Sequence, residues 1–388
     1  MTGLTDLAAA ARRAAAAGPD TGRAADSAPK RATAPGRAPA EDRAPAQLPR
    51  IGLVLSGGGA KGAYHVGVVE YLASVGTSVH AIAGASIGAL NGAILAAAGT
   101  PAAGAAALTA VWEEVAWQAG SAPPADGAGG PPPEETTWER LARILPRLSA
   151  PALQPAALEQ LVADHVDPDR LGSGIPLWVS AFPALEEIDS LRGWSWTLDV
   201  VRSGLGARAE WLHVNDLPRR ERHRAVLASA ALPVVLPPRR VGRSLYRDGG
   251  MADNTPAGAL ARYARCDIVI VVHLSDGALW DAHDHPALRV IEIRPRHRIR
   301  PPGPAGGATA LVDLSPKRLR HLRRQGFEDA RWTMEPLRAA LSAVEGARTA
   351  QSRMLDAVAR LDDEARPDDE ARLDDEAGEP GLPPGLSG

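Results

Sequence analysis

The stretch from Ile51 to Gly92 constrains the fold more than any other part of this 388-residue chain. It begins with a short apolar run, Ile51 to Ser56, that stops at glycines, as a buried parallel strand does. The glycine-rich run Gly57 to Gly62 follows, and apolar residues then recur at helical spacing from Ala63 to Ala73. Successive glycines cost backbone entropy, but they let bare N–H groups converge at a helix N-terminus, which favours negative charge. This half predicts a strand, an anion-binding loop and a helix.

The second half of the stretch repeats the strand-to-helix pattern around a serine. We expect a strand from Val79 to Ala83 and a small-residue helix from Ala89 to Ala98, with Gly84-Ala85-Ser86-Ile87-Gly88 between them. A serine between two glycines at such a turn sits on a tight bend that pushes its hydroxyl outward. Because the carboxyl ends of adjacent parallel strands share one edge of a sheet, Ser86 and the glycine loop should lie together. The pattern predicts acyl transfer, in which Ser86 attacks a carbonyl and the loop amides hold the oxyanion.

A serine nucleophile needs a base, and the best candidate is Asp248 in Asp248-Gly249-Gly250. The three motifs in this order, with their flanking segments, resemble those of the bacterial patatin-like phospholipase family. The flanking segments are Ala63-Tyr64-His65-Val66-Gly67, Ala89-Leu90-Asn91-Gly92 and Asp253-Asn254-Thr255-Pro256. The resemblance covers Pro49 to Glu345, and three ordered motifs are far more specific than any one alone.

The resemblance implies a fold, an activity and a role for each motif residue. The fold would be a three-layer α/β/α domain with a mostly parallel central sheet. The activity would be calcium-independent hydrolysis of acyl esters in phospholipids or other lipids, with no cofactor and no metal. Ser86 would form an acyl-enzyme, and Asp248 would be the general base of a dyad without histidine. The remaining site residues would be the oxyanion loop Gly57, Gly58, Gly59, Lys61 and Gly62, the elbow glycines Gly84 and Gly88, and the supporting Gly249 and Gly250.

Two nucleotide-binding interpretations of the glycine run are weaker. Gly57, Gly59 and Gly62 fit the dinucleotide pattern, which expects a carboxylate at the end of the next strand, but Ala83 to Ser86 stands there. A phosphate-binding P-loop is excluded because Gly62, not Ser or Thr, follows Lys61.

Two other functions stay open. One is an α/β-hydrolase with a Ser–Asp–His triad, for which His273 and His285 are the candidate histidines, although Ser86 comes unusually early for that fold. The other is a lipid-binding or regulatory protein that keeps the fold without the activity. Loss of Ser86 or Asp248 would have favoured the second, and both are present.

Composition divides the chain into three parts. Residues 1–48 are rich in Ala, Pro and Arg and hold few large apolar side chains, so we expect disorder there. Residues 49–345 form the expected catalytic domain, with a Pro/Gly-rich loop over 121–133. Residues 346–388 are expected to hold a helical extension and an acidic disordered tail.

The same composition limits location and partners. The net charge of −3 gives no reason to expect nucleic acid binding. Cys266 is the single cysteine, so the chain has no internal disulfide, and we find neither a secretory signal nor an apolar run long enough to span a membrane. We expect a cytoplasmic protein with a lipid substrate and transient contact with a membrane surface; the oligomeric state is not predicted.

Patterning elsewhere predicts further elements. We expect helices over 111–117, 138–148, 156–165 and 222–231, and a long helix opened by Ser315-Pro316 that continues to about Leu361. We expect strands over 175–182, 194–200, 267–274 and 290–293. Trp117 and Trp138 are candidates for lipid contact near the site mouth, with core packing as the alternative for each.

Overall fold

The structure is a computed structural model that describes residues 49–121, 155–185, 199, 202–232, 236–275, 280–286, 288–300 and 306–364. All of them belong to one compact unit, Pro49–Gly388. The segments expected over 1–48 and 138–148, nearly all of the 121–133 loop, Trp138 and the acidic tail beyond Glu364 lie outside the described residues. So does the strand expected over 194–200, apart from Asp199, which is not in a strand. The division into three parts stays a prediction.

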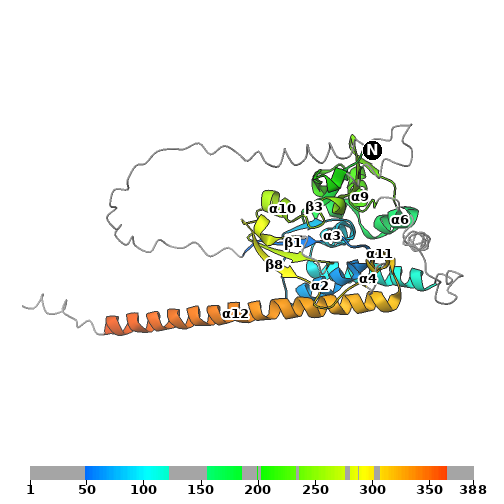
Figure 1. Cartoon of the computed structure of the whole chain (residues 1–388). Helices are drawn as coiled ribbons and strands as arrows, with labels where there is room; N and C mark the ends of the chain where they lie inside the picture. The colour runs from blue at the N-terminus through cyan, green and yellow to red at the C-terminus, as the bar shows by residue number, and fades with distance from the viewer. Residues whose placement is uncertain are drawn as a thin grey trace, which may run out of the picture. The chain divides into compact units, whose positions relative to one another are not determined.

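An eight-stranded mixed sheet forms the centre of the unit (Figure 1). Its main strand order is β5-β6-β3-β2-β1-β7-β8, and β4 also pairs with β3. The five strands from β3 to β8 in that order are parallel, whereas β4, β5 and β6 are joined by antiparallel pairs. The strands are β1 Ile51–Leu55, β2 Ala81–Gly84, β3 Leu177–Pro183, β4 Glu210–His213, β5 Arg239–Val241, β6 Ser244–Asp248, β7 Ile268–Val272 and β8 Arg289–Ile293.

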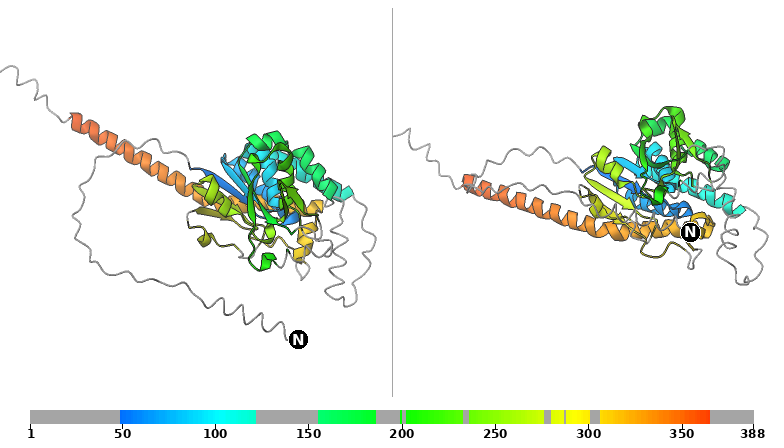
Figure 2. Two further views of the ribbon diagram at one scale, coloured as in Figure 1. Left: turned by 90° about the horizontal axis from the view of Figure 1, so that it is seen from above. Right: turned by 45° about the horizontal axis from the view of Figure 1, so that its top comes forward.

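Helices connect the strands and lie on both faces of the sheet (Figures 1 and 2). The expected strand–loop–helix and strand–turn–helix units are confirmed as β1–α2 and β2–α3, with a 3₁₀ turn, η1 (Gly59–Gly62), opening the first helix. The helices are α2 Ala63–Ser74, α3 Ile87–Ala98, α4 Pro101–Ser121, α6 Pro155–His165, α7 Pro168–Ser173, α9 Arg219–Ser229, α10 Ala257–Ala259, α11 Gly306–Val312 and α12 Pro316–Glu364.

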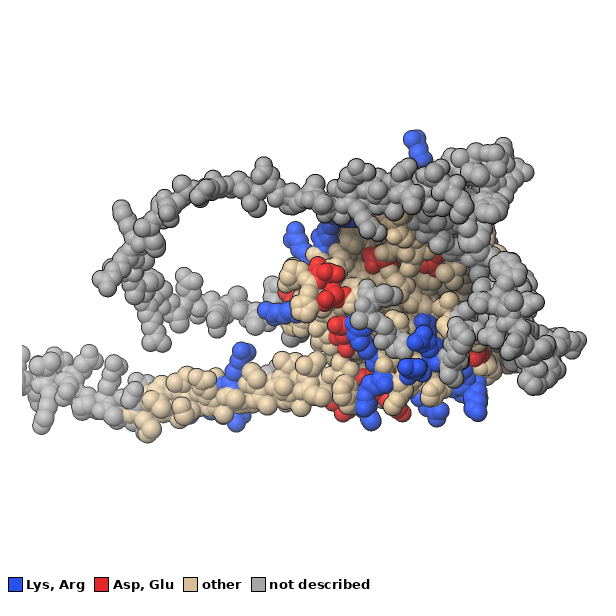
Figure 3. All heavy atoms as spheres, in the orientation of Figure 1, with Lys and Arg blue, Asp and Glu red and all other residues tan. Residues whose placement is uncertain are grey.

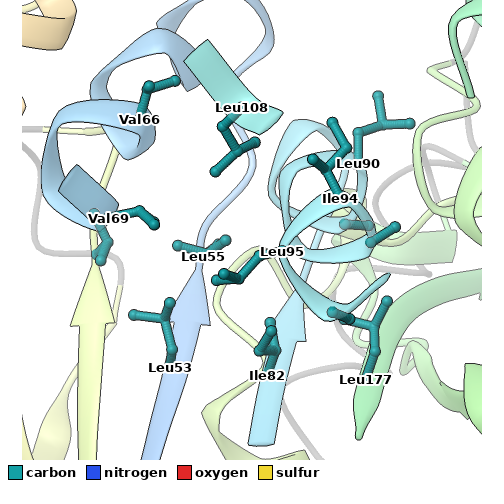
Figure 4. Packing of buried hydrophobic residues seen from close by; sticks show 14 of the residues in the cluster. Leu53, Leu55, Val66, Val69, Ile82, Leu90, Ile94, Leu95, Leu108 and Leu177 are labelled. Carbon is teal, nitrogen blue, oxygen red and sulfur yellow. The ribbon is translucent and has the colours of Figure 1, made fainter. Parts of the chain in front are cut away.

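The alternation of side chains along β1 divides the core into two clusters. Leu53 and Leu55 point to one face, where they pack with α2, α3 and α4, and Val54 points to the other, where it packs with α10 and the turn after it. Figure 4 shows the first cluster, in which Leu53, Leu55 and Ile82 from the sheet lie against Val69 of α2 and Leu95 of α3. Both faces are therefore buried, which confirms the three-layer α/β fold.

The N-terminal part of α12 packs closely against α2 (Figure 2). Two glycines make this approach possible. A Cβ added to Gly67 of α2 would lie 1.8 Å from the Arg323 carbonyl oxygen, and one added to Gly326 of α12 would lie 2.1 Å from the Tyr64 carbonyl oxygen. Across the same contact the Tyr64 hydroxyl donates to Asp329 at 3.0 Å. Because α2 begins at the glycine loop, α12 braces the helix that carries this loop.

Candidate active site

The turn between β2 and α3 holds Ser86 in a strained conformation. Its φ and ψ angles are 55° and −124°, and it is one of two described non-glycine residues with positive φ. The neighbouring glycines are sterically required. A Cβ on Gly84 would lie 2.5 Å from the Gly88 carbonyl oxygen, and one on Gly88 would lie 2.0 Å from that of Leu55. This is the geometry of a nucleophile elbow, in which a strained turn projects the serine hydroxyl from the sheet edge.

A buried serine on α9 fixes the elbow to the sheet. The Ser86 amide donates to the Ser229 hydroxyl at 3.1 Å, and this hydroxyl donates to the Ser180 carbonyl of β3 at 2.6 Å. Ser229 is fully buried, so water does not compete for either bond. Ser229 therefore links the backbone of Ser86 to the backbone of β3 through these two hydrogen bonds.

Asp248 ends β6, next to Ala181 of β3. Its amide donates to the Ala231 carbonyl at 3.0 Å, just beyond α9, and its Oδ1 accepts from the Gly250 amide at 2.7 Å. A Cβ on Gly249 would lie 2.1 Å from the Ser180 carbonyl oxygen, so glycine is required beside it. The same region of β3 and α9 thus positions both Ser86 and Asp248.

The Asp248 carboxyl is 1% exposed, and this burial raises its pKa from 3.8 to about 7, against opposing hydrogen bonds from the Ser86 side chain and the Gly250 amide. Among the described residues, Oδ2 has no partner at ordinary hydrogen-bond geometry. The Ser86 hydroxyl is thus near enough to affect the carboxyl without forming a short bond to it.

The glycine loop is held against Ser86 by Asn254. The Gly57 amide donates to the Asn254 carbonyl at 3.2 Å, and the Asn254 side-chain amide donates to the Gly57 carbonyl at 3.3 Å. A Cβ on Gly57 would lie 3.1 Å from that of Ser86, so the loop passes directly beside the serine. Since the Gly57 amide is engaged, the amides available at the start of η1 are those of Gly58 and Gly59, where a helix supplies no acceptors of its own.

Lys61 and Gly62 complete the loop and are both anchored. The Lys61 ammonium donates to the Leu274 carbonyl at 2.6 Å, just after β7. The Gly62 carbonyl accepts from the Asn91 side chain at 3.0 Å, and Asn91 in turn accepts from the Trp112 indole at 3.0 Å. The loop therefore has bonds to α3, to the segment after β7 and to Asn254.

An apolar cavity of about 110 Å³ has Ser86 in its wall. Its other walls come from η1, α3, α4, α6 and the segments after α9 and α11. Gly59 and Ala60 line it together with Ser86; the rest of the lining includes Leu90, Ile94, Val111, Val115, Leu158, Leu161 and Leu236. An apolar lining of this kind is suited to binding a hydrocarbon chain.

The two histidines considered for a triad have other partners. His273 Nε2 lies 2.9 Å from Glu292, and His285 stacks on Trp280. Burial and the nearby Arg294 lower the pKa of His273 to about 4. Within the described part of the chain, no hydrogen bond joins Ser86 to a histidine.

The described residues also include no cluster of side chains that could hold a metal ion.

With this geometry in view, comparison with known proteins gives a consistent result. The family model for patatin-like phospholipases matches residues 53–261, more than half of the chain. The chain belongs to the patatin-like phospholipase family. This confirms the family that the three ordered motifs resembled.

The curated relatives are uncharacterized NTE family proteins of Mycobacterium bovis and of two Mycobacterium tuberculosis strains. Each is 27% identical over 238 residues, which is 61% of this chain and 52% of the relative. The chain therefore spans about half the length of these relatives. Within the described part of this chain, no helix is both long and apolar enough to cross a membrane.

Two bacterial effector structures are also similar. VipD from Legionella pneumophila aligns with a TM-score of 0.38 and 14% identity, covering 74% of this chain and 67% of that one. The type III effector ExoU of Pseudomonas aeruginosa aligns with a TM-score of 0.34 and 18% identity, covering 74% and 53%.

Three residues of the patatin-like site were not predicted as site residues. Asn254 and Asn91 were named only in the segments that flank the motifs, and Ser229 lay only within the helix expected over 222–231. Each acts through a bond to the backbone of a residue distant in sequence. The signal that could have found them is a small polar side chain in an otherwise apolar or glycine-rich segment beside a motif.

Proposed function

We propose that this protein hydrolyses acyl esters of lipids, with Ser86 as nucleophile and Asp248 as general base. The observation that carries the proposal is the position of Ser86, which stands on a strained elbow in the wall of an apolar cavity and near a buried carboxyl. The oxyanion would be bound by the amides of Gly58 and Gly59, the two loop residues that follow Gly57, whose added Cβ would lie 3.1 Å from that of Ser86.

In the acylation step, Ser86 Oγ attacks the ester carbonyl carbon while its proton passes to Asp248 Oδ2, the oxygen without a partner. The negative charge on the tetrahedral intermediate is stabilised by the loop amides. The intermediate then collapses, the C–O bond to the alcohol breaks, and the alcohol leaves with the proton from Asp248. The acyl group stays on Ser86 with its hydrocarbon chain in the cavity.

In the deacylation step, Asp248 takes a proton from water, which attacks the acyl-enzyme carbonyl. Collapse of the second intermediate releases the carboxylic acid and returns the proton from Asp248 to Ser86 Oγ. One base serves both half-reactions, as microscopic reversibility requires. The raised pKa of Asp248 suits it to this exchange near neutral pH.

The first experiment measures labelling by a fluorophosphonate, read by intact mass, beside turnover of a fluorogenic ester. We expect wild type to be labelled and active, and Ser86→Ala and Asp248→Asn to lose both. His273→Ala is the control, because its side chain bonds to Glu292, and it should keep both. Survival of Asp248→Asn together with loss of His273→Ala would favour a triad instead. A folded wild type that binds lipid without labelling or turnover would favour a regulatory protein.

A second experiment tests the cavity as the acyl-chain site. Ile94 lines the cavity two helical turns beyond Ser86, so Ile94→Phe fills part of the cavity away from the serine. We expect turnover of long-chain esters to fall by roughly tenfold, about the effect of losing one or two methylene contacts, with short-chain turnover kept. Equal loss for both chain lengths would mean that the acyl chain binds elsewhere.

A further inference from the structure

The distal half of α12 carries an exposed apolar stripe that the catalytic domain does not use. Its seven large side chains are between 42% and 65% exposed: Leu337, Leu341, Val344, Met354, Leu355, Val358 and Leu361. Figure 3 shows charged side chains gathered near the body end of α12 and few of them on the distal half in that view. Exposed apolar side chains in this number on one helix indicate a surface that is normally covered.

The stripe continues the contact face of the buried half of the same helix. Phe327, Ala330 and Met334 pack against the core, and Leu337, Leu341 and Val344 follow with the same alternating spacing of three and four residues. The spacing then passes through Arg348 and Gln351 and returns to Leu355 and Val358. This is the heptad pattern of a coiled coil, with two polar positions in the middle of the exposed part.

We propose that a second copy of this chain covers the stripe, through an antiparallel coiled coil between residues 337 and 361 of the two α12 helices. In the register that centres the polar positions, Leu341 faces the partner's Val358. Val344 then faces the partner's Leu355, and Arg348 faces the partner's Gln351. Each pair occurs twice because the contact has two-fold symmetry. From Leu341 to Val358 each apolar position meets an apolar one, whereas Leu337 lies opposite the partner's Asp362 at the two ends of the contact. The charged position meets a neutral side chain that can accept its hydrogen bond.

The paired stripe positions form the seam of this coiled coil. In the same register, the side chains beside the seam are complementary in size. Ala340 faces the partner's Leu361, and Ala347 faces the partner's Met354. Each small residue leaves room for the large one opposite, as close packing of two helices requires. Leu361 and Met354 are 63% and 62% exposed in the single chain, so this pairing also accounts for the two stripe residues beside the main seam.

The parallel arrangement and a membrane surface fit less well. Parallel helices would place Arg348 against the partner's Arg348 at the seam, where like charges repel. A helix that lies on a membrane usually has a strongly basic polar face. Here the distal half carries Arg338, Arg348, Arg353 and Arg360 together with acidic residues, Asp356 among them, and Arg348 lies within the stripe itself.

The test measures the mass of the full chain in solution by light scattering at micromolar concentrations. We expect wild type to be a dimer and Leu341→Glu with Val358→Glu to be a monomer, with a dissociation constant raised more than ~100-fold. The matched control, Ala343→Glu with Ala357→Glu, places the same charges off the seam and should stay dimeric. Ester turnover should be kept in both, which shows that the body is folded. A monomeric wild type, or a dimer that survives the seam substitutions, would overturn the proposal.

Crosslinking tests the orientation. Val344→Cys and Leu355→Cys chains, treated with a short bis-maleimide, should crosslink poorly alone and well when mixed, and Cys266 is buried and so should react little. Crosslinking of each variant with itself but not with the other would mean a parallel pair and overturn the antiparallel register.

A third experiment measures binding to phospholipid vesicles. A wild type that binds them as a monomer, and loses binding on Leu341→Glu with Val358→Glu, would assign the stripe to a membrane and overturn the proposal.

Discussion

The Asp248 carboxyl is buried, and its Oδ1 accepts a hydrogen bond from the Gly250 amide. No described residue forms a hydrogen bond of ordinary geometry to Oδ2. Burial raises the pKa of this carboxyl to about 7, so near neutral pH a substantial fraction of the molecules carries a protonated Asp248. Only the ionised form can take the proton from Ser86.

This pKa predicts opposite effects of pH on turnover and on stability. We expect kcat/KM to rise as the pH passes upward through about 7, because the base becomes ionised. Ionisation of the same carboxyl should destabilise the folded state. Its folded pKa lies above the unfolded value of 3.8, so between the two the folded state binds more protons, and stability falls as the pH rises from 3.8 to about 7.

Asp248→Asn separates these effects. The variant should be inactive, yet above pH 7 it should unfold less readily than wild type by roughly 1–3 kcal/mol, since no buried charge forms. Near pH 4 the two proteins should be about equally stable, because Asp248 is then neutral when folded. Denaturant unfolding at both pH values measures the difference. A variant that is less stable than wild type at high pH would contradict this account of Asp248.

At the scale of elements, the contact between α2 and α12 depends on backbone approach. Gly326→Ala places a methyl group against the Tyr64 carbonyl, so the helices must separate, and overpacking of this kind costs typically ~1–3 kcal/mol. Gly346→Ala is a matched control in the same helix, where a Cβ meets no atom within 4 Å. It should stabilise α12 by up to ~1 kcal/mol.

Thermal unfolding of the two variants measures the difference. We also expect Gly326→Ala to lower ester turnover, because α2 carries the glycine loop at its N-terminus and shifts with α12. Equal melting temperatures for the two variants would mean that this crossing contributes little to stability.

The elements that could be predicted from sequence are those whose signals are local. The glycine run, the serine elbow and the buried strands β1, β3 and β7 each show their pattern within a few residues. β4, β5 and β6 were not predicted, because they are short, polar in part and held by antiparallel partners elsewhere in the chain. Ser86 and Asp248 were predicted as a pair from their motifs and the family resemblance, whereas the bonds of Ser229 and Asn254 that position the turn and the loop required the assembled fold.

At the scale of the whole molecule, the folding unit extends beyond the family match. That match ends at residue 261, but β7 pairs with β1, the Leu274 carbonyl anchors Lys61, and α12 covers α2. Removal of residues from 338 onward should therefore keep ester turnover and thermal stability, whereas removal from 262 onward should abolish both. Retained turnover in the shorter chain would mean that β7 and α12 are dispensable for the site.

The strand order also affects the sequence of events during synthesis, because the ribosome makes the chain from its N-terminus. β1 and β2 emerge early, but β7, the neighbour of β1 on its other side, begins at Ile268. At ~5–20 residues per second, this leaves β1 as an open sheet edge for tens of seconds during synthesis. The Ser56 amide meanwhile lacks the Val272 carbonyl and Lys61 lacks that of Leu274, so the loop beside Ser86 has neither anchor. Ser86 is translated early, and its surroundings are completed only when most of the protein has left the ribosome.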